Sequence, residues 1–134
     1  MTYYLGKISK TEYLILKDQN KIKFTIKTKC FQGIKKFYTT SYLNVLNPDN
    51  YIYNLEIEIH EFVKNELSEL ELKSNIIFNQ KQFIQFVVHK ELNLDSSINL
   101  NSDLNLDIEV DKIKINEKLK SYQIILKLIK IQNN

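Results

Sequence analysis

Alternation of apolar and polar residues with a period of two constrains this chain more than any other feature. It is clearest over residues 21–29. The residues on the apolar face there are Ile22, Phe24, Ile26 and Thr28. Successive side chains of a strand point to opposite faces of the sheet, so this pattern predicts a half-buried β-strand. Because alternating segments outnumber helical ones, the sequence predicts more strand than helix.

The first third of the chain reads as strands throughout. Residues 13–16 are apolar, and the turn-forming residues 18–20 join them to the strand at 21–29, which predicts a β-hairpin. Gly33 is expected to separate that hairpin from a third strand over residues 36–46, which is rich in aromatic and β-branched residues.

The last third alternates as well. Apolar residues from Ile98 to Val110 occupy one face and acidic or amide residues the other, and the phase reverses at residues 111–112, which indicates a β-bulge or bend. A turn at 116–118 leads to a final strand over residues 121–131. That strand is apolar on both faces and is therefore the best candidate for the middle of the sheet.

Helix signals occupy the middle of the chain. Asn47 is a favourable N-cap and Pro48 suits the first helical position, and apolar residues then recur at intervals of three and four, which predicts a helix over residues 48–72. The alternative is a strand over residues 51–59. A second helix is predicted over residues 79–91 from Asn79 and Gln82 in a capping box, against a strand over residues 83–89.

Strands, then two helices, then strands predict an α+β fold. We expect one domain spanning residues 1–134, with an antiparallel sheet and two central helices packed on one of its faces.

Composition says more about the source than about the partner. The sequence has no Ala and no Arg, two Gly and one Pro, which indicates an AT-rich genome such as that of a small-genome bacterium, its plasmids or a phage. That bias accounts for much of the Lys content, so the net charge of +3 is weak evidence for an anionic partner. The single Cys30 and the lack of a long apolar run predict a cytoplasmic protein with no membrane partner.

Residues that carry chemistry are few. Neither glycine lies in a dinucleotide or P-loop motif. Cys30, His60 and His89 form no known nucleophile motif, and Glu56 with His60 supplies two of the three or four ligands that zinc requires. The sequence therefore predicts no enzyme, no cofactor and no metal site, and Cys30 is expected to be an ordinary thiol.

Lysines and aromatic residues gather in the first third. The lysines of this basic set are Lys21, Lys23, Lys27, Lys29, Lys35 and Lys36. The rings beside them are Phe31, Phe37, Tyr38 and Tyr42. Such a surface holds single-stranded nucleic acid through phosphate contacts and base stacking, and without Arg the binding would be electrostatic and of low specificity.

Charge is also segregated along the chain. Residues 1–40 hold nine Lys and two acidic residues, whereas residues 41–111 hold four Lys and thirteen acidic residues. Either the opposite charges face each other within the sheet, or they join subunits. The acidic residues considered for such an interface are Glu56, Glu61, Glu66 and Glu69. The function predicted first is a small non-enzymatic interaction or assembly protein that forms homo-oligomers, and the alternative is nucleic-acid binding.

Overall fold

The computed structural model describes residues 2–79, 81–90, 92 and 102–132. Strands make up 62% of these residues and helix 11%. The strands are β1 (Tyr3–Ser9), β2 (Glu12–Lys17), β3 (Lys23–Phe37), β4 (Thr40–Leu46), β5 (Glu71–Leu72), β6 (Ile76–Asn79), β7 (Lys81–Val88), β8 (Asp103–Asn116) and β9 (Ser121–Gln132). The helix is α1 (Tyr51–Val63). The excess of strand over helix is confirmed, but the predicted α+β fold with two central helices is wrong.

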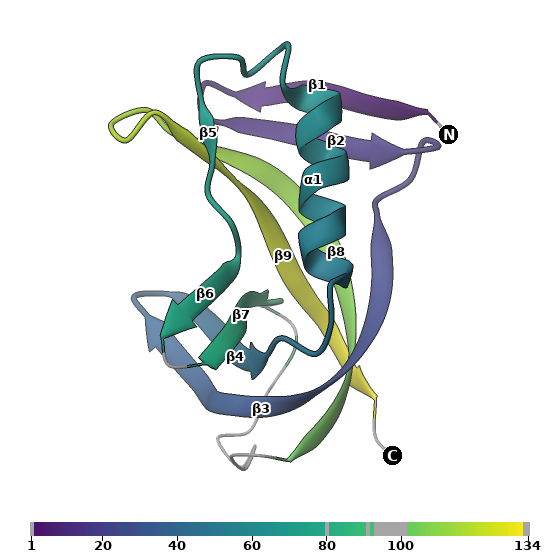
Figure 1. The fold of residues 1–134 in the computed structure, drawn as a ribbon, viewed down its shortest axis with the longest axis vertical. Coiled ribbons are helices and arrows are strands. Elements are labelled where there is room, and N and C mark those ends of the chain that lie inside the picture. Colours follow the sequence, from purple (N-terminus) through teal and green to yellow (C-terminus); the bar gives the residue numbers. More distant parts are fainter. Residues whose placement is uncertain (1, 80, 91, 93–101, 133–134) are drawn as a thin grey trace.

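Five of the strands close on themselves into a small barrel, which we call the closed sheet. Its order is β8-β3-β4-β7-β9, and β9 pairs again with β8. Only β7 and β9 run parallel within this ring. The hairpin of β1 and β2 extends from β8, β5 adds to β9, and β6 adds to β7. Figure 1 shows the β1–β2 hairpin at one end of the molecule and β3 curving from beside β8 toward β4.

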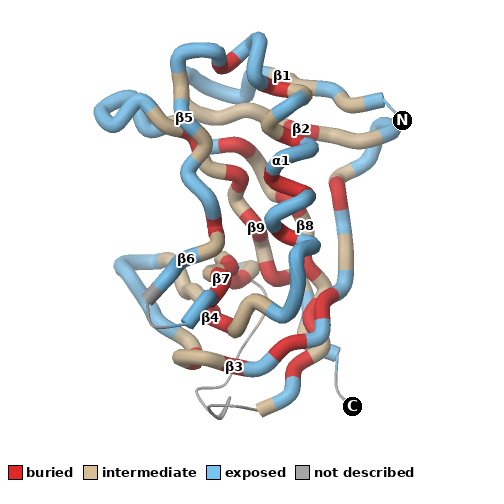
Figure 2. Tube along the Cα trace, in the orientation of Figure 1, coloured by how far each residue is buried: buried red, intermediate tan, exposed pale blue. Residues whose placement is uncertain are grey.

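The core lies inside the closed sheet and beneath α1, as the buried residues in Figure 2 show. Strand β3 contributes Ile26, Thr28 and Cys30 at alternate inward positions, and α1 contributes Ile52, Leu55 and Ile59 at helical spacing. Burying an aliphatic side chain of this size stabilises a fold by about 1.5–3 kcal/mol. The alternation in β3 and the helical spacing in α1 thus direct the buried side chains of both elements into one core.

Helix α1 is shorter than the predicted span of residues 48–72. The β4–β7 ladder continues to Asn47, whose N–H donates to the Gln82 carbonyl at 3.1 Å, so Asn47 does not cap the helix. The Asp49 carboxylate instead accepts from the Tyr51 N–H at 2.9 Å. The helix ends at Val63 because the chain then turns to place β5 beside β9, where the Lys73 N–H donates to the Tyr122 carbonyl at 2.8 Å. The alternative strand over residues 51–59 is also wrong.

The second predicted helix, over residues 79–91, is a pair of strands. Strands β6 and β7 pair antiparallel, with Asn79 opposite Lys81, and β7 also pairs with β4 and β9. The β-prone residues 86–88 therefore outweigh the local capping signals, because strand pairing on both sides of β7 buries Phe86 and Val88.

Two predicted connections also differ. Residues 18–20 form a turn, but β2 and β3 do not pair, because β8 lies between them. Gly33 lies within β3 rather than between strands, at a bulge where its φ is 73°. The bulge predicted at residues 111–112 is confirmed by the register shift between Val110 and Lys112. Ile98 and Leu100 of the predicted strand lie outside the described residues.

Candidate nucleic-acid interface

Strand β3 carries most of the predicted basic residues and pairs with two different neighbours. Its first half, Lys23 to Lys29, pairs with β8, and its second half, from Cys30 to Phe37, pairs with β4. The change of partner occurs at the bulge between Cys30 and Gly33, where the Gly33 N–H donates to the Cys30 Sγ at 3.2 Å. The positive φ of Gly33 suits a bulge residue without a side chain.

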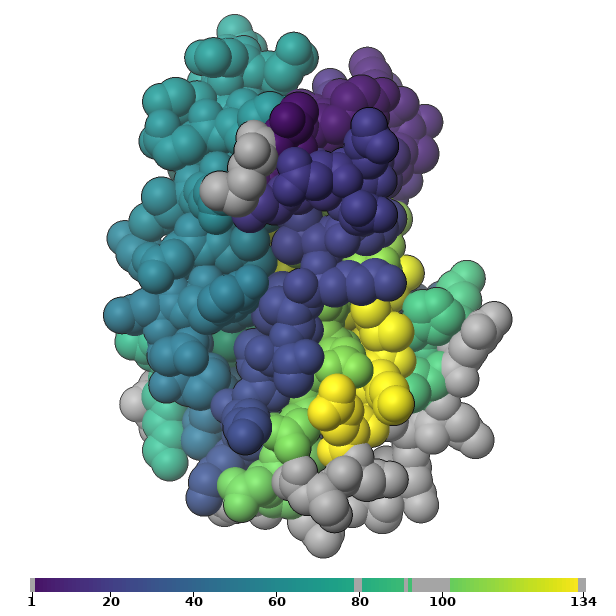
Figure 3. Space-filling model, turned by 90° about the vertical axis from the view of Figure 1, so that its right-hand side faces the viewer, coloured from purple at the N-terminus to yellow at the C-terminus, as the bar shows by residue number. Residues whose placement is uncertain are grey.

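The first half of β3 faces acidic residues. Lys23 lies opposite Glu109, and Lys29 lies opposite Asp103 with 3.8 Å between the amine and the carboxylate. Lys21 and Lys127 both contact the Asp111 carboxylate, at 3.8 and 3.1 Å. Figure 3 shows β3 beside β8 and β9 on this side of the molecule. We call Lys21, Lys23, Lys27 and Lys29 the lysine row: Lys21 and Lys29 form ion pairs and Lys23 lies opposite Glu109, whereas Lys27 lies opposite the uncharged Asn105.

Asp107 belongs to the same acidic row. Its carboxylate accepts from the Thr25 hydroxyl at 2.8 Å and from the Gln132 amide at 2.9 Å, and these hydrogen bonds hold the pKa of the carboxyl below its usual value. The acidic residues of β8 thus lie beside the lysines of β3, so this part of the charge segregation falls within the sheet.

The second half of β3 lies beside uncharged residues. Its partner β4 has no charged residue, and Lys35 lies opposite Tyr42. Among the described residues, neither Lys35 nor Lys36 forms an ion pair. We call Lys35, Lys36, Phe37, Tyr38 and Tyr42 the hairpin surface. Lys35, Phe37 and Tyr42 share one face of the hairpin and Lys36 lies on the other, because successive side chains of a strand alternate. Neither lysine has a paired carboxylate among the described residues.

Two rings at the tip of this hairpin are open to solvent. Phe37 is 65% exposed and Tyr38 is 85% exposed. Their ring centroids are 4.5 Å apart in an edge-to-face arrangement, at an interplanar angle of 76°. Each ring thus keeps a π-face available to a planar ligand.

Tyr38 has a strained backbone. It is the first of two residues that connect β3 to β4, and its φ is 56°. Gly is the usual residue at such a position because a Cβ makes the left-handed region unfavourable, by roughly 1–2 kcal/mol. Strain of this kind is concentrated at functional sites. Asp18, Gln19 and Lys120 also have a positive φ, and the chain has only two Gly, so the backbone at Tyr38 supports a functional role only together with its exposed ring.

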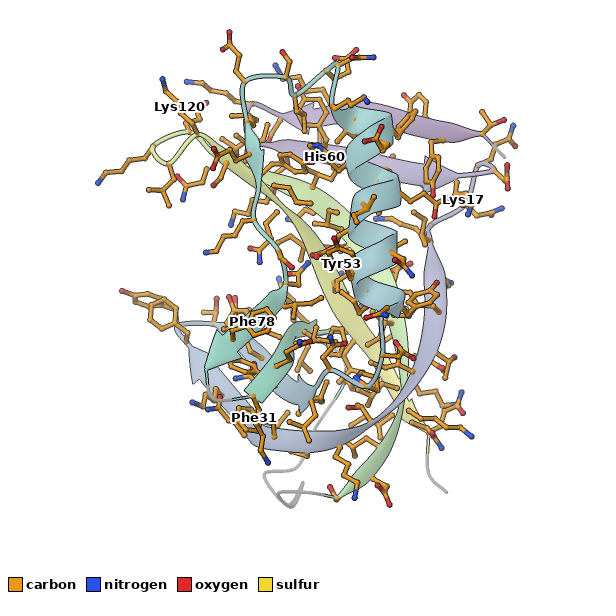
Figure 4. All side chains as sticks on the ribbon, viewed as in Figure 1. Lys17, Phe31, Tyr53, His60, Phe78 and Lys120 are labelled. Carbon is orange, nitrogen blue, oxygen red and sulfur yellow. The ribbon has the colours of Figure 1, made fainter. Side chains whose placement is uncertain are left out.

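The face of the sheet next to the hairpin carries further rings and amides. Phe31 of β3 and Phe83 of β7 have their ring centroids 5.0 Å apart, and Figure 4 shows Phe31 on the lower part of β3. Between the Phe31–Phe83 pair and the tip, the Asn44 amide donates to Gln32 at 2.7 Å. Among the described residues, the buried Asn44 Oδ1 has no donor. The sequence missed Phe83 because it placed that residue in a helix.

The four predicted acidic residues do not form one surface. Glu56 is 3% exposed, and its carboxylate accepts from the Ser74 hydroxyl at 2.6 Å and from the Asn75 backbone N–H at 2.8 Å. It ties α1 to the segment before β6 and is unavailable to a partner. Glu61 is exposed and binds Lys64 at 2.7 Å, which lowers the pKa of Glu61. Glu66 and Glu69 are exposed but lie beyond the end of α1.

The residues considered for catalysis and metal binding are dispersed. Cys30 is buried in the core, and burial raises the pKa of its thiol. His60 Nδ1 is hydrogen-bonded to the Tyr122 hydroxyl, whose pKa is raised to about 12 by burial and by Glu56. Within the described part of the chain, no group of three or more His, Cys, Asp or Glu residues could hold a metal ion.

Two cavities meet at Asn47. One, of about 510 Å³, is lined by Lys27, Lys29 and Asp103, among others. The other, of about 370 Å³, is lined by Tyr53 and Phe78, which Figure 4 shows on α1 and β6. In the first cavity Asp103 offsets the charge of Lys29, and the residues lining the second include no cation. Neither combines rings and unpaired cations as the hairpin surface does.

No protein family, curated protein or solved structure matches this chain. In the described residues, no helix has the length and apolar character needed to cross a membrane.

Proposed function

We propose that this protein binds single-stranded nucleic acid with low sequence specificity through the hairpin surface. The observation that carries the proposal is the pair of exposed rings, Phe37 and Tyr38, directly after two lysines that have no carboxylate partner among the described residues.

Each part of the hairpin surface suits a different part of such a ligand. The Lys35 and Lys36 amines neutralise phosphates and release counterions. The Phe37 and Tyr38 rings stack on bases, and one such contact stabilises a complex by about 1–3 kcal/mol. Lys does not make the bidentate base contacts of Arg, and the chain has no Arg, so the surface reads the backbone and the ring faces rather than base edges.

The architecture agrees with this proposal. Some small five-stranded barrels bind oligonucleotides on one face and at the loop between their first and second strands. In the closed sheet, β3 and β4 are the first two strands along the chain, and Tyr38 lies in the loop between them. Fold does not assign function by itself, so the proposal depends on the residues at this loop.

Assembly through the lysine row and an acidic helix face is less well supported. Residues of β8 form ion pairs with Lys21 and Lys29, and Glu56 is buried. We therefore propose nucleic-acid binding rather than assembly through these residues.

The test is a fluorescence-anisotropy titration of labelled oligodeoxythymidine at low salt. Wild type is expected to bind, and Phe37→Ala with Tyr38→Ala is expected to weaken binding by roughly 5- to 150-fold per ring, the equivalent of about 1–3 kcal/mol. The matched control is Phe78→Ala, which removes another ring that is 74% exposed but lies on β6. Equal losses in the two variants, or no binding by wild type, would contradict the proposal.

A further inference from the structure

We propose that the cleft between the start of α1 and β6 binds a neutral saccharide. This cleft, of about 370 Å³, is the second of the two cavities that meet at Asn47, and its volume lies in the range of small-molecule sites. Asn50 and Tyr53 line it from the α1 side, and Ile76 and Phe78 line it from β6. We call it the α1–β6 cleft. It includes no residue of the hairpin surface, so this inference goes beyond the proposed function and does not depend on it.

The charge of the cleft restricts its ligand. None of the described residues that line it is charged, although 26% of the residues in the chain are. Three other cavities, of about 510, 400 and 320 Å³, each contain lysine and an acidic residue. A phosphate or carboxylate group in the α1–β6 cleft would find no counterion among these residues, so the ligand it suits is neutral.

Polar side chains in the cleft keep hydrogen-bonding groups for a ligand. Asn47 Nδ2 donates to Gln82 Oε1 at 2.9 Å, and among the described residues Gln82 Nε2, the Asn50 side-chain amide and the Tyr53 hydroxyl have no partner. These three groups come from three segments of the chain. A saccharide carries hydroxyls around its ring, each able to donate and to accept, whereas a nucleobase has such groups only along its edge. Several separate polar groups therefore favour the saccharide.

Two exposed rings supply the apolar part of the cleft. Phe78 is 74% exposed and Tyr53 is 54% exposed, and Figure 4 shows Tyr53 on α1 and Phe78 on β6. The face of an aromatic ring is apolar, and the C–H face of a pyranose is the apolar surface that a sugar presents. Rings and uncharged polar groups in one cleft thus match the two kinds of surface on a sugar.

The two walls of the cleft are tied together by buried hydrogen bonds. The Glu56 carboxylate of α1, which is 3% exposed, accepts from the Ser74 hydroxyl at 2.6 Å and from the Asn75 N–H at 2.8 Å. Ser74 Oγ in turn accepts from the Ile76 N–H, at 3.0 Å, where β6 begins. The cleft is therefore formed before a ligand enters, and a preformed site loses less conformational entropy on binding.

The test is a titration of ¹⁵N-labelled protein with the neutral disaccharides maltose, cellobiose, lactose, mannobiose and chitobiose. At least one is expected to cause saturable shifts of the amides of Asn50, Tyr53, Phe78 and Gln82, with residues 35–42 unchanged. Phe78→Ala and Tyr53→Ala should each weaken binding about 2- to 12-fold, as expected for the loss of one ring contact. Phe37→Ala is the matched control, because Phe37 is 65% exposed but lies outside the cleft, and it should bind the disaccharide like wild type.

Three results would overturn the proposal. The first is the absence of saturable shifts in the cleft with every disaccharide, and the second is unchanged affinity in both Phe78→Ala and Tyr53→Ala. The third is saturable binding of thymidine to the cleft in place of the disaccharides, which would assign the cleft to a nucleobase. Failure of oligodeoxythymidine to bind the hairpin surface would contradict the proposed function alone, because no residue is shared between the two sites.

Discussion

The first half of β3 carries three lysines and the second half carries two, and the halves differ in the residues that lie opposite them. Lys23, Lys27 and Lys29 face β8, which carries Asp103, Asp107 and Glu109. Lys35 and Lys36 face β4, which is uncharged and contributes Tyr42. On the proposed function, a basic strand binds nucleic acid only where its partner strand leaves the lysine charge uncompensated, and the pairing register determines where that occurs.

The largest expected difference between the halves is in salt dependence. Lys35→Gln with Lys36→Gln is expected to reduce the slope of log affinity against log salt by about 1.4, since each phosphate contact to a single strand contributes about 0.7. At about 0.1 M salt, this corresponds to a roughly 25-fold loss of oligonucleotide affinity. The matched variant, Lys23→Gln with Lys29→Gln, removes the two first-half lysines that lie opposite carboxylates and should leave the slope almost unchanged. Equal slopes for the two variants would remove the distinction between the halves.

Removing the acids should make the first half resemble the second. Asp103→Asn, Asp107→Asn and Glu109→Gln together leave Lys23, Lys27 and Lys29 without opposing charge. We expect affinity for oligodeoxythymidine to rise several-fold and the salt slope to steepen, by up to about 0.7 for each lysine that becomes available. Unchanged affinity would show that the acidic residues of β8 do not prevent Lys23, Lys27 and Lys29 from binding the oligonucleotide. Circular dichroism checks that the variant is folded.

Tyr38 permits a prediction in which stability and binding change in opposite directions. Tyr38→Gly relieves the positive φ and should raise the free energy of unfolding by about 1 kcal/mol, measured by urea denaturation, while weakening oligonucleotide binding about fivefold or more. Gln19→Gly is the control, because Gln19 also has a positive φ, of 69°, but lies outside the hairpin surface. It should gain stability and keep its affinity. If both variants bind like wild type, the Tyr38 ring has no role in binding.

The smallest expected effect concerns Asp107. Its folded-state pKa is lowered by hydrogen bonds from Thr25 and Gln132, so its contribution to stability is present above the ordinary pKa of Asp, about 3.9, and is lost as the pH falls through the folded-state value. Thermal unfolding of wild type and Asp107→Asn across this acidic range should differ most at neutral pH and converge at low pH. A constant difference would mean that the ionised carboxylate is not responsible.

Much of the strand content could be predicted from the sequence, because period-two alternation is a local property. The strands at residues 21–29 and 121–131 and the bulge near residue 111 all follow from it. The topology could not be predicted so well. The turn at residues 18–20 is present, yet β8 lies between β2 and β3, and nothing local to the turn specifies that insertion.

The predicted helix starts also show that local signals do not determine the topology. The local signals for capping at Asn47 and Asn79 are real, but both residues are taken up by strand pairing, Asn47 with Gln82 and Asn79 with Lys81. Several hydrogen bonds within a sheet outweigh one cap, which contributes about 1 kcal/mol.

The residues of the candidate site could be predicted from the sequence. Which of the lysines lie opposite acidic residues could not. Lys35, Lys36, Phe37, Tyr38 and Tyr42 all belong to the basic and aromatic set visible in the sequence. Which lysines of that set are compensated depends on strand register, and the strained backbone of Tyr38 appears only in the structure.

The central claim is that one half of β3 binds nucleic acid and the other does not. The most direct test is to follow the backbone amide resonances of ¹⁵N-labelled protein while unlabelled oligodeoxythymidine is added at low salt. We predict saturable shifts over residues 35–42 and at Phe31, with amides 23–29 and 103–109 little changed. Shifts concentrated on amides 23–29 and 103–109, or no saturable shift anywhere, would contradict it.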